Sequence, residues 1–137
     1  MGKSKQQKEL TLESAQRLHD SAERKFAIAA IEAGLEVKTG PSIRCKQPVE
    51  DKTGRKRKTV TQPDFTIVDP SDPKSPLHVE VTNGKCTSPS KQAQRRVVEQ
   101  ARVDNYVQLS GDAVEELASA ETPQSKRTFL SKLFSRK

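Results

Sequence analysis

The chain has 137 residues, of which 31% are hydrophobic and 31% are charged, and its mean hydropathy is −0.82. This length suits one domain with a small core, and no apolar run approaches the ~20 residues that a helix needs to cross a bilayer. The N-terminus lacks the apolar segment of a secretory signal, and two cysteines do not make a disulfide framework. We therefore expect an intracellular protein (cytoplasmic, nucleoid or nuclear) with reduced thiols and no membrane span.

The formal net charge of +7 is unevenly distributed. Residues 1–8 contain three lysines and no acid, and residues 124–137 contain five basic residues and no acid. Positions 9–123 hold 17 basic and 18 acidic residues, with one internal basic run: Lys52, Arg55, Lys56, Arg57 and Lys58. Basic ends and a basic loop on a neutral body favour a polyanionic partner, because cations displace the counterions of phosphates. Solubilising ends and a solvated turn are the alternative.

In chain order, residues 1–10 resemble a disordered basic arm. A helical pattern then extends from Thr11 to about Gly34, because apolar residues recur at steps of three and four. Glycine is a suitable C-terminal stop for this helix. A strand over 35–49 follows, with an interruption at Gly40-Pro41.

Residues 50–58 form a polar, turn-rich segment, and residues 59–68 (TVTQPDFTIV) form the next strand. We expect the two strands to pair as a hairpin with a basic loop. Pro63 indicates a bulge, a bend or an edge position in the second strand. A proline-rich turn over 69–76 leads to the third strand, over 77–82.

A second helix extends from Ser88 to about Arg102, since serine suits an N-cap and the following proline suits a first turn. We expect its apolar residues to face the sheet. A fourth strand over 105–109 and a short third helix after Gly111 complete the pattern.

The elements have the order α-β-β-β-α-β-α. We expect one domain over 11–121, between a disordered basic arm over 1–10 and a flexible basic tail over 122–137. The predicted fold class is α/β, with a central mixed four-stranded sheet flanked by helices.

Two acidic residues stand within the apolar strands: Asp64 opens FTIV, and Glu80 lies inside LHVEV. A carboxylate inside a buried strand is unfavourable unless a cation, a hydrogen-bond network or a metal pairs with it. Because strand side chains alternate, Glu80 shares a face with His78 and Thr82, and Asp64 can converge on Glu80 if the strands are neighbours. The two carboxylates and the backbone carbonyl of Val81 would form an oxygen site suited to Mg²⁺ or Mn²⁺. Salt bridges to neighbouring Lys or Arg are the alternative.

Pro63-Asp64, a spacer of 15 residues and Glu80-Val81-Thr82 resemble the motif of the PD-(D/E)XK nuclease superfamily. The expected element order matches the restriction-endonuclease-like core of that superfamily, and the size and layout are most similar to small Holliday junction resolvase-like nucleases. The resemblance implies a Mg²⁺-dependent endonuclease that hydrolyses phosphodiesters in DNA, such as branched, recombination, repair or restriction substrates. It also implies that Glu23, on the first helix, joins Asp64, Glu80 and the carbonyl of Val81 as a metal ligand.

The chain departs from the motif at Thr82, which stands where the family has a lysine. A hydroxyl can bond the attacking water but supplies no cation. Two lysines are candidates for a displaced cation: Lys85, just after the strand, and Lys91, in the first turn of the second helix, which is slightly favoured. Gln94, one turn further on, could also reach inward. Either lysine could instead be an ordinary exposed residue, and His78 a base, a hydrogen-bond donor or a plain strand histidine.

The basic run over 52–58 and the ends of the chain would contact phosphates, with Arg95 and Arg96 as further contacts. DNA is favoured over RNA, and a homodimer is expected because so small a monomer has little surface for a long duplex. Two other functions stay open. The same fold could be a catalytically inactive nucleic-acid-binding or assembly module, with Thr82 marking a lost site, or an adaptor whose basic ends bind acidic proteins or a membrane surface.

Overall fold

The computed structural model describes residues 7–50 and 56–134. Its centre is a four-stranded sheet in the order β1-β4-β5-β6. The strands are β1 (Glu36–Thr39), β4 (Phe65–Val68), β5 (Leu77–Val81) and β6 (Tyr106–Leu109). The first three pair antiparallel, and β5 pairs with β6 in parallel, so the predicted α/β fold with a mixed sheet flanked by helices is confirmed.

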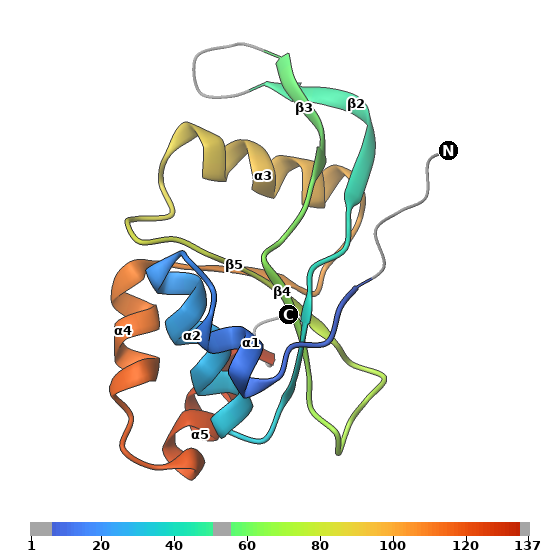
Figure 1. Ribbon diagram of the computed structural model, residues 1–137. Helices are drawn as coiled ribbons and strands as arrows, with labels where there is room; N and C mark the ends of the chain where they lie inside the picture. The colour runs from blue at the N-terminus through green and yellow to red at the C-terminus, as the bar shows by residue number, and fades with distance from the viewer. Residues whose placement is uncertain (1–6, 51–55, 135–137) are drawn as a thin grey trace.

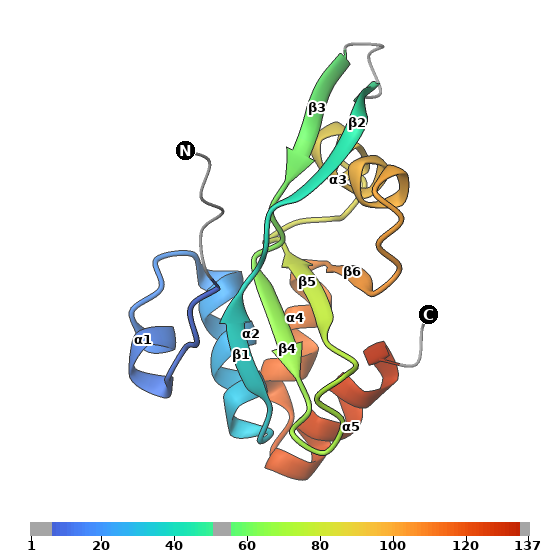
Figure 2. The ribbon, with the colours of Figure 1, turned by 90° about the vertical axis from the view of Figure 1, so that its right-hand side faces the viewer.

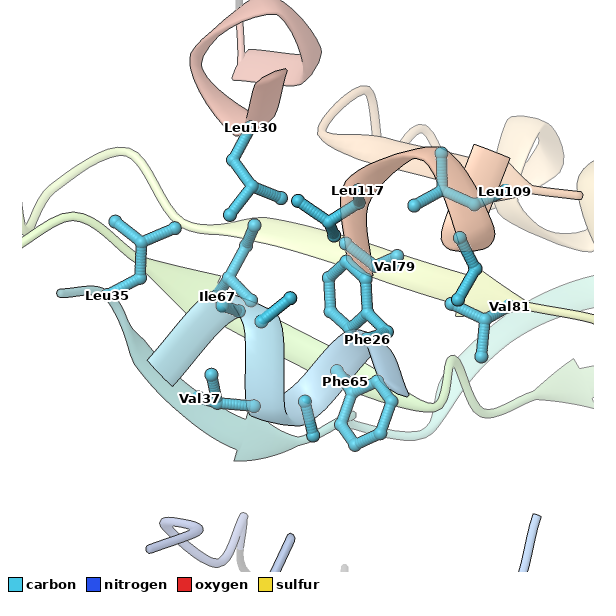
Figure 3. Packing of buried hydrophobic residues seen from close by; sticks show 14 of the residues in the cluster. Phe26, Leu35, Val37, Phe65, Ile67, Val79, Val81, Leu109, Leu117 and Leu130 are labelled. Atoms are coloured by element: carbon cyan, nitrogen blue, oxygen red, sulfur yellow. The ribbon is translucent and has the colours of Figure 1, made fainter. Parts of the chain in front are cut away.

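Three helices cover one face of this sheet: α2 (Ser21–Glu32), α4 (Gly111–Ser119) and α5 (Pro123–Phe134) (Figure 2). The main core fills the space between the helices and the sheet (Figure 3). At its centre Phe26 of α2 stacks on Phe65 of β4, with ring centroids 5.4 Å apart. Both rings are almost completely buried. Within the described ranges, no helix is both long and apolar enough to cross a membrane.

A second unit rises from the end of the sheet (Figure 1). It consists of a separate two-stranded sheet of β2 (Ile43–Glu50) and β3 (Lys56–Thr61), with α3 (Pro89–Gln100) lying against both strands. Cys45, Ala93 and Val97 form its small apolar cluster. We expected the apolar face of α3 to lie on the central sheet; part of it covers the hairpin instead.

The two units meet where both hairpin strands are interrupted. The amide of Gly40 donates to the carbonyl of Asp64 (3.2 Å), and a β-carbon on Gly40 would lie 2.0 Å from the Pro63 carbonyl oxygen. Only glycine therefore permits this close approach of the two chains. The interruptions predicted at Gly40-Pro41 and at Pro63 are both confirmed, and they end β1 and β3.

The predicted long first helix is wrong in one respect, because it is two helices, α1 (Leu12–Gln16) and α2. The break precedes Asp20, whose side chain accepts a hydrogen bond from the amide of Glu23 (2.9 Å) and so starts a new helix. The end at Gly34 is confirmed, and its φ of +89° explains the choice of glycine.

The predicted boundaries of the disordered ends need correction. Residues 7–10 are paired with β1, since the amide of Leu10 donates to the Val37 carbonyl (2.7 Å). The expected tail contains α5, in which Leu130 and Leu133 are buried. This short apolar segment lacks the length to form a stable helix alone, and packing against α2 and α4 supplies the missing stabilisation.

Candidate functional site

Asp64 lies immediately before β4, beside the end of β5. Its Oδ2 accepts a hydrogen bond from the backbone amide of Val81 (2.9 Å). The amides of His78 and Thr82 bond to carbonyls on the β6 side of β5, those of Asn105 and Leu109. Because a strand presents its backbone groups alternately to its two neighbours, the amide and carbonyl of Val81 both face β4. The fold therefore brings Asp64 to the edge of β5 at Val81, as the sequence predicted.

Glu80 is the buried acid of the site, with a residue exposure of 6%. Its Oε2 accepts a hydrogen bond from Nζ of Lys91, and the two form an ion pair. Its other oxygen, Oε1, is buried and has no hydrogen-bond partner among the described residues. Only one of the two carboxylate oxygens of Glu80 thus has a partner among the described residues, and that partner is Lys91 of α3.

The position of Lys91 follows from the start of α3. Ser88 is the N-cap, and its hydroxyl accepts a hydrogen bond from the amide of Lys91 (3.2 Å), which fixes this lysine in the first turn. Of the two candidate cations, the fold thus brings Lys91 to Glu80. Lys85 is exposed in the loop after β5 and makes no hydrogen bond or ion pair with the rest of the described chain. The Thr82 hydroxyl accepts a bond from the amide of Gly84 (3.3 Å) in the same loop.

Asp64 and Glu23 both have raised pKa values, because they are partly buried and lie near the charge of Glu80. Burial, and next the negative charge of Glu80, raise the pKa of Asp64 from 3.8 to about 7, against the opposing effects of the Val81 amide and of Lys91. Burial also raises the pKa of Glu23, with Asp20 and Glu80 adding to the rise. The mutual influence shows that Asp64, Glu80 and Glu23 belong to one cluster of negative charge.

Sequence reasoning missed Asp20. Besides capping α2, its Oδ2 accepts a hydrogen bond from Nδ2 of Asn83 (3.0 Å), which ties the start of α2 to the loop after β5. This contact positions Glu23, in the first turn of α2, near the other acids. The signal was present, because Asp20 precedes Glu23 at the spacing of a helix cap, but the apolar pattern extends across it.

His78 is held by a chain of hydrogen bonds that links the segment before α1 to β4 and β5. The side-chain amide of Gln7 donates to the Thr66 hydroxyl (2.8 Å), and that hydroxyl lies 2.7 Å from Nδ1 of His78. The Thr66 hydroxyl is buried and already accepts a hydrogen bond from Gln7. We therefore assign its own hydrogen to the bond with Nδ1 of His78, which makes Nδ1 the acceptor. Burial lowers the pKa of His78. The lowered pKa and an accepting Nδ1 together favour a neutral ring with its proton on Nε2.

The residues of α3 that face the sheet form a second polar network. NH1 of Arg95 donates to Oε1 of Gln108 and to the carbonyl of Cys86, and Nε2 of Gln108 donates to the Lys91 carbonyl (2.9 Å). Arg95 thus links α3 to β6 through NH1. Its contact with phosphate, which would use its other nitrogens, stays a prediction. Gln94 does reach inward, and its Oε1 is buried without a partner in the described chain.

The other predicted phosphate contacts are only partly described. Arg96 is exposed on α3. Lys56, Arg57 and Lys58 belong to β3, but the structure describes only their backbone. Lys52 and Arg55, in the basic loop, lie outside the described residues.

The donor set at this site is small. No group of three or more His, Cys, Asp or Glu side chains in residues 7–50 and 56–134 is arranged to hold a metal ion. Two carboxylates and a backbone carbonyl nevertheless suit Mg²⁺, which keeps several waters and binds few protein ligands. The unpartnered Oε1 of Glu80 and the raised pKa of Asp64 both indicate negative charge that a cation would compensate.

Comparisons of the chain with protein-family models, with curated proteins and with solved structures found no match. A functional assignment therefore depends on the geometry of the site itself. That geometry is a buried acid, a second acid at a strand edge and a lysine from a helix, at the junction of the two structural units.

Proposed function

We propose that the protein is a metal-dependent nuclease that hydrolyses phosphodiesters, with DNA as the favoured substrate. One observation carries this proposal. Glu80 is buried in a strand, pairs with Lys91 through one oxygen and leaves its second oxygen unpartnered among the described residues. Burial and the charge of Glu80 raise the pKa of Asp64 to about 7. Such an arrangement destabilises the fold, and groups with perturbed pKa values of this kind concentrate at functional sites.

In this proposal Glu80, Asp64 and the carbonyl of Val81 would hold the ion. A bound Mg²⁺ or Mn²⁺ would supply a Lewis acid for a phosphate oxygen and lower the pKa of a bound water. Glu23, whose pKa the charge of Glu80 raises, would add negative charge near the ion. The amide of Val81 fixes the orientation of the Asp64 carboxylate by holding its Oδ2.

Lys91 has the role that the family gives to its motif lysine. Its ammonium carries three donors, of which one is used by Glu80, so it can donate to the attacking water or to a phosphate oxygen. A fixed cation at this point stabilises the negative charge that develops on the phosphorane-like transition state. Thr82 supplies no cation and instead shapes the loop after β5.

A metal titration on linear, branched and single-stranded DNA and on RNA tests the proposal. Cleavage should require Mg²⁺ or Mn²⁺, and Asp64→Asn and Glu80→Gln should each reduce single-turnover cleavage at least about 100-fold. Asparagine keeps an acceptor for the Val81 amide, so the backbone geometry is retained. Without substrate, Mg²⁺ should raise the melting temperature of the wild type and not that of Asp64→Asn.

The ion pair also favours a second candidate function. Because Lys91 already compensates part of the charge of Glu80, the fold could serve as a nucleic-acid-binding module that binds no metal. Salt-sensitive binding, with no cleavage and no thermal shift at any metal concentration, would identify this module and contradict the nuclease. Sedimentation with and without DNA tests the expected homodimer.

A further inference from the structure

A basic hollow lies between β2 and the C-terminal end of α3, at the other end of that helix from Lys91. Its volume is about 520 Å³. Among the described residues that line it, three are cations and none is an acid: Arg44, Cys45, Lys46, Gln100, Ala101 and Arg102. The three cationic side chains have no hydrogen bond or ion pair with the rest of the described chain. They are available to an external anion.

The alternation of β2 explains why two of these cations lie together. Cys45 is buried in the small cluster with Ala93 and Val97, under α3. Its neighbours Arg44 and Lys46 therefore take the alternate positions of the strand, and both are exposed. The burial of Cys45 thus leaves both flanking cations exposed to solvent.

Arg102 is the third cation, and its backbone is unusual. Among the described residues it is the non-glycine residue with a positive φ, of 61°. Its amide bonds to the Glu99 carbonyl (3.0 Å) and the amide of Val103 to the Val98 carbonyl (3.1 Å). These are the bonds of a Schellman helix end, where glycine is the usual residue at this position. Stability alone would favour glycine here, so the arginine indicates a role for its side chain.

The exposed β2–β3 ribbon and the length of α3 favour an extended polyanion as the partner of the hollow. A two-stranded ribbon such as β2–β3 has the width that a nucleic-acid major groove admits. Val60, paired with Arg44, is 37% exposed, so this part of the ribbon is uncovered. Lys91 and Arg102 are separated by the length of α3, about 16 Å at the helical rise. For a duplex lying along α3, this length corresponds to about five base-pair steps of ~3.4 Å along the duplex axis.

We propose that this hollow binds a backbone phosphate of the nucleic acid on which the protein acts, about 16 Å along α3 from the phosphate at Lys91. The partner rests on the proposed function, since the phosphodiester chain is its substrate. Arg44, Lys46 and Arg102 neutralise that phosphate without reading sequence, because contacts to phosphate position the chain and carry no base information.

Binding in EDTA, measured by fluorescence anisotropy on 20-nucleotide DNA and RNA, single-stranded and duplex, tests the hollow without requiring cleavage. Arg44→Ala and Lys46→Ala should each weaken binding about three- to tenfold and lower the slope of log affinity against log salt by about one. Lys74→Ala is the matched control. It removes the same charge from the exposed turn between β4 and β5, at the opposite end of the molecule from the hairpin (Figure 2).

Arg102→Gly separates binding from stability. Glycine suits the positive φ, so the melting temperature should hold or rise by up to about 4 °C while binding weakens about three- to tenfold. Unchanged affinity and salt slope for 20-nucleotide ligands in all three variants would overturn the proposal.

The binding experiment on the hollow and the cleavage experiment on the proposed nuclease can fail independently. If the hollow variants bind weakly but the wild type never cleaves, the hollow stands and the nuclease fails. If Asp64→Asn abolishes cleavage but the hollow variants bind like the wild type, the nuclease stands and the hollow fails.

Discussion

The two units of the molecule differ in what holds them together. Between the central sheet and helices α2, α4 and α5 lies a continuous core that includes Phe26, Phe65 and Leu130. Among the described side chains, the hairpin and α3 share the small cluster of Cys45, Ala93 and Val97. The first unit therefore supplies most of the stability, whereas the second carries exposed basic residues. The candidate site lies where they meet, and the Glu80–Lys91 ion pair takes one partner from each.

The difference between the units explains how the fold tolerates Glu80, a buried acid with one oxygen unpartnered in the described chain. Glu80 is held in a strand of the well-packed unit, so it cannot move away from its neighbours. Its cation comes from the less extensively packed unit, where a shift of α3 would release it. The stable unit thus fixes the negative charges, and the smaller unit supplies the compensating positive charge.

The largest expected effect is a difference in unfolding free energy between substitutions in the main core and in the small cluster. Phe26→Ala should lower the free energy of unfolding by about 3–5 kcal/mol, since it removes a fully buried ring and leaves a cavity. Val97→Ala, in the small cluster, should cost about 1–2 kcal/mol. Urea denaturation measures both values. Equal losses would show that the two units are equally well packed and would remove the basis of the comparison.

The charge on Asp64 should make stability depend on pH. The pKa of Asp64 is about 7 in the folded chain against an ordinary 3.8, so the folded state holds the proton more tightly. Its stabilising contribution is fully present below about pH 4 and is lost as the pH rises through about 7. Over this interval we expect a loss of about 2–4 kcal/mol in EDTA.

Asp64→Asn should remove this part of the pH dependence and be more stable than the wild type at pH 8. Denaturation curves at a series of pH values measure the effect. A variant that is less stable than the wild type at pH 8 would show that the carboxylate is not under strain.

Breaking the ion pair between the units should have an intermediate effect. Lys91→Met keeps most of the side-chain volume but leaves Glu80 buried without its cation, at a cost of about 2–3 kcal/mol. Adding Glu80→Gln to that variant should recover most of the loss, because the unpaired charge is gone. Additive losses in this double-mutant cycle would mean that the two side chains do not interact.

The smallest expected effect concerns the strand histidine. Thr66→Val should cost about 1–2 kcal/mol, because it removes the hydroxyl shared by Gln7 and His78. Nitrogen NMR of the wild-type imidazole should report a neutral ring protonated at Nε2, and Thr66→Val should shift this tautomer balance. A wild-type ring protonated at Nδ1 would contradict the assigned direction of the hydrogen bonds.

Much of the fold and the central pair of acids could be predicted from the sequence. Alternation in two short apolar runs predicted that Asp64 and Glu80 can converge if their strands are neighbours, and β4 and β5 do pair. The serine cap before Pro89 predicted that Lys91 lies in a first helical turn. These signals are local and depend on residues within a few positions of one another. For that reason they persist in the folded chain.

The missed features depend on contacts between distant residues. The sequence of α5 is too short and polar to predict a stable helix, and only packing against α2 and α4 makes it one. The apolar pattern around Leu18 continues through the break between α1 and α2, so the capping role of Asp20 was not recognised. That α3 covers the hairpin could not be predicted either, because its apolar face suits either sheet.

Cleavage of a nucleic-acid panel as a function of Mg²⁺ concentration tests the central claim most directly. We predict that the wild type and Lys74→Ala cleave only with the ion, whereas Asp64→Asn and Lys91→Met, shown to be folded by circular dichroism, are at least about 100-fold slower. Cleavage that persists in EDTA, or that Asp64→Asn leaves unchanged, would contradict a metal site at the junction of the two units.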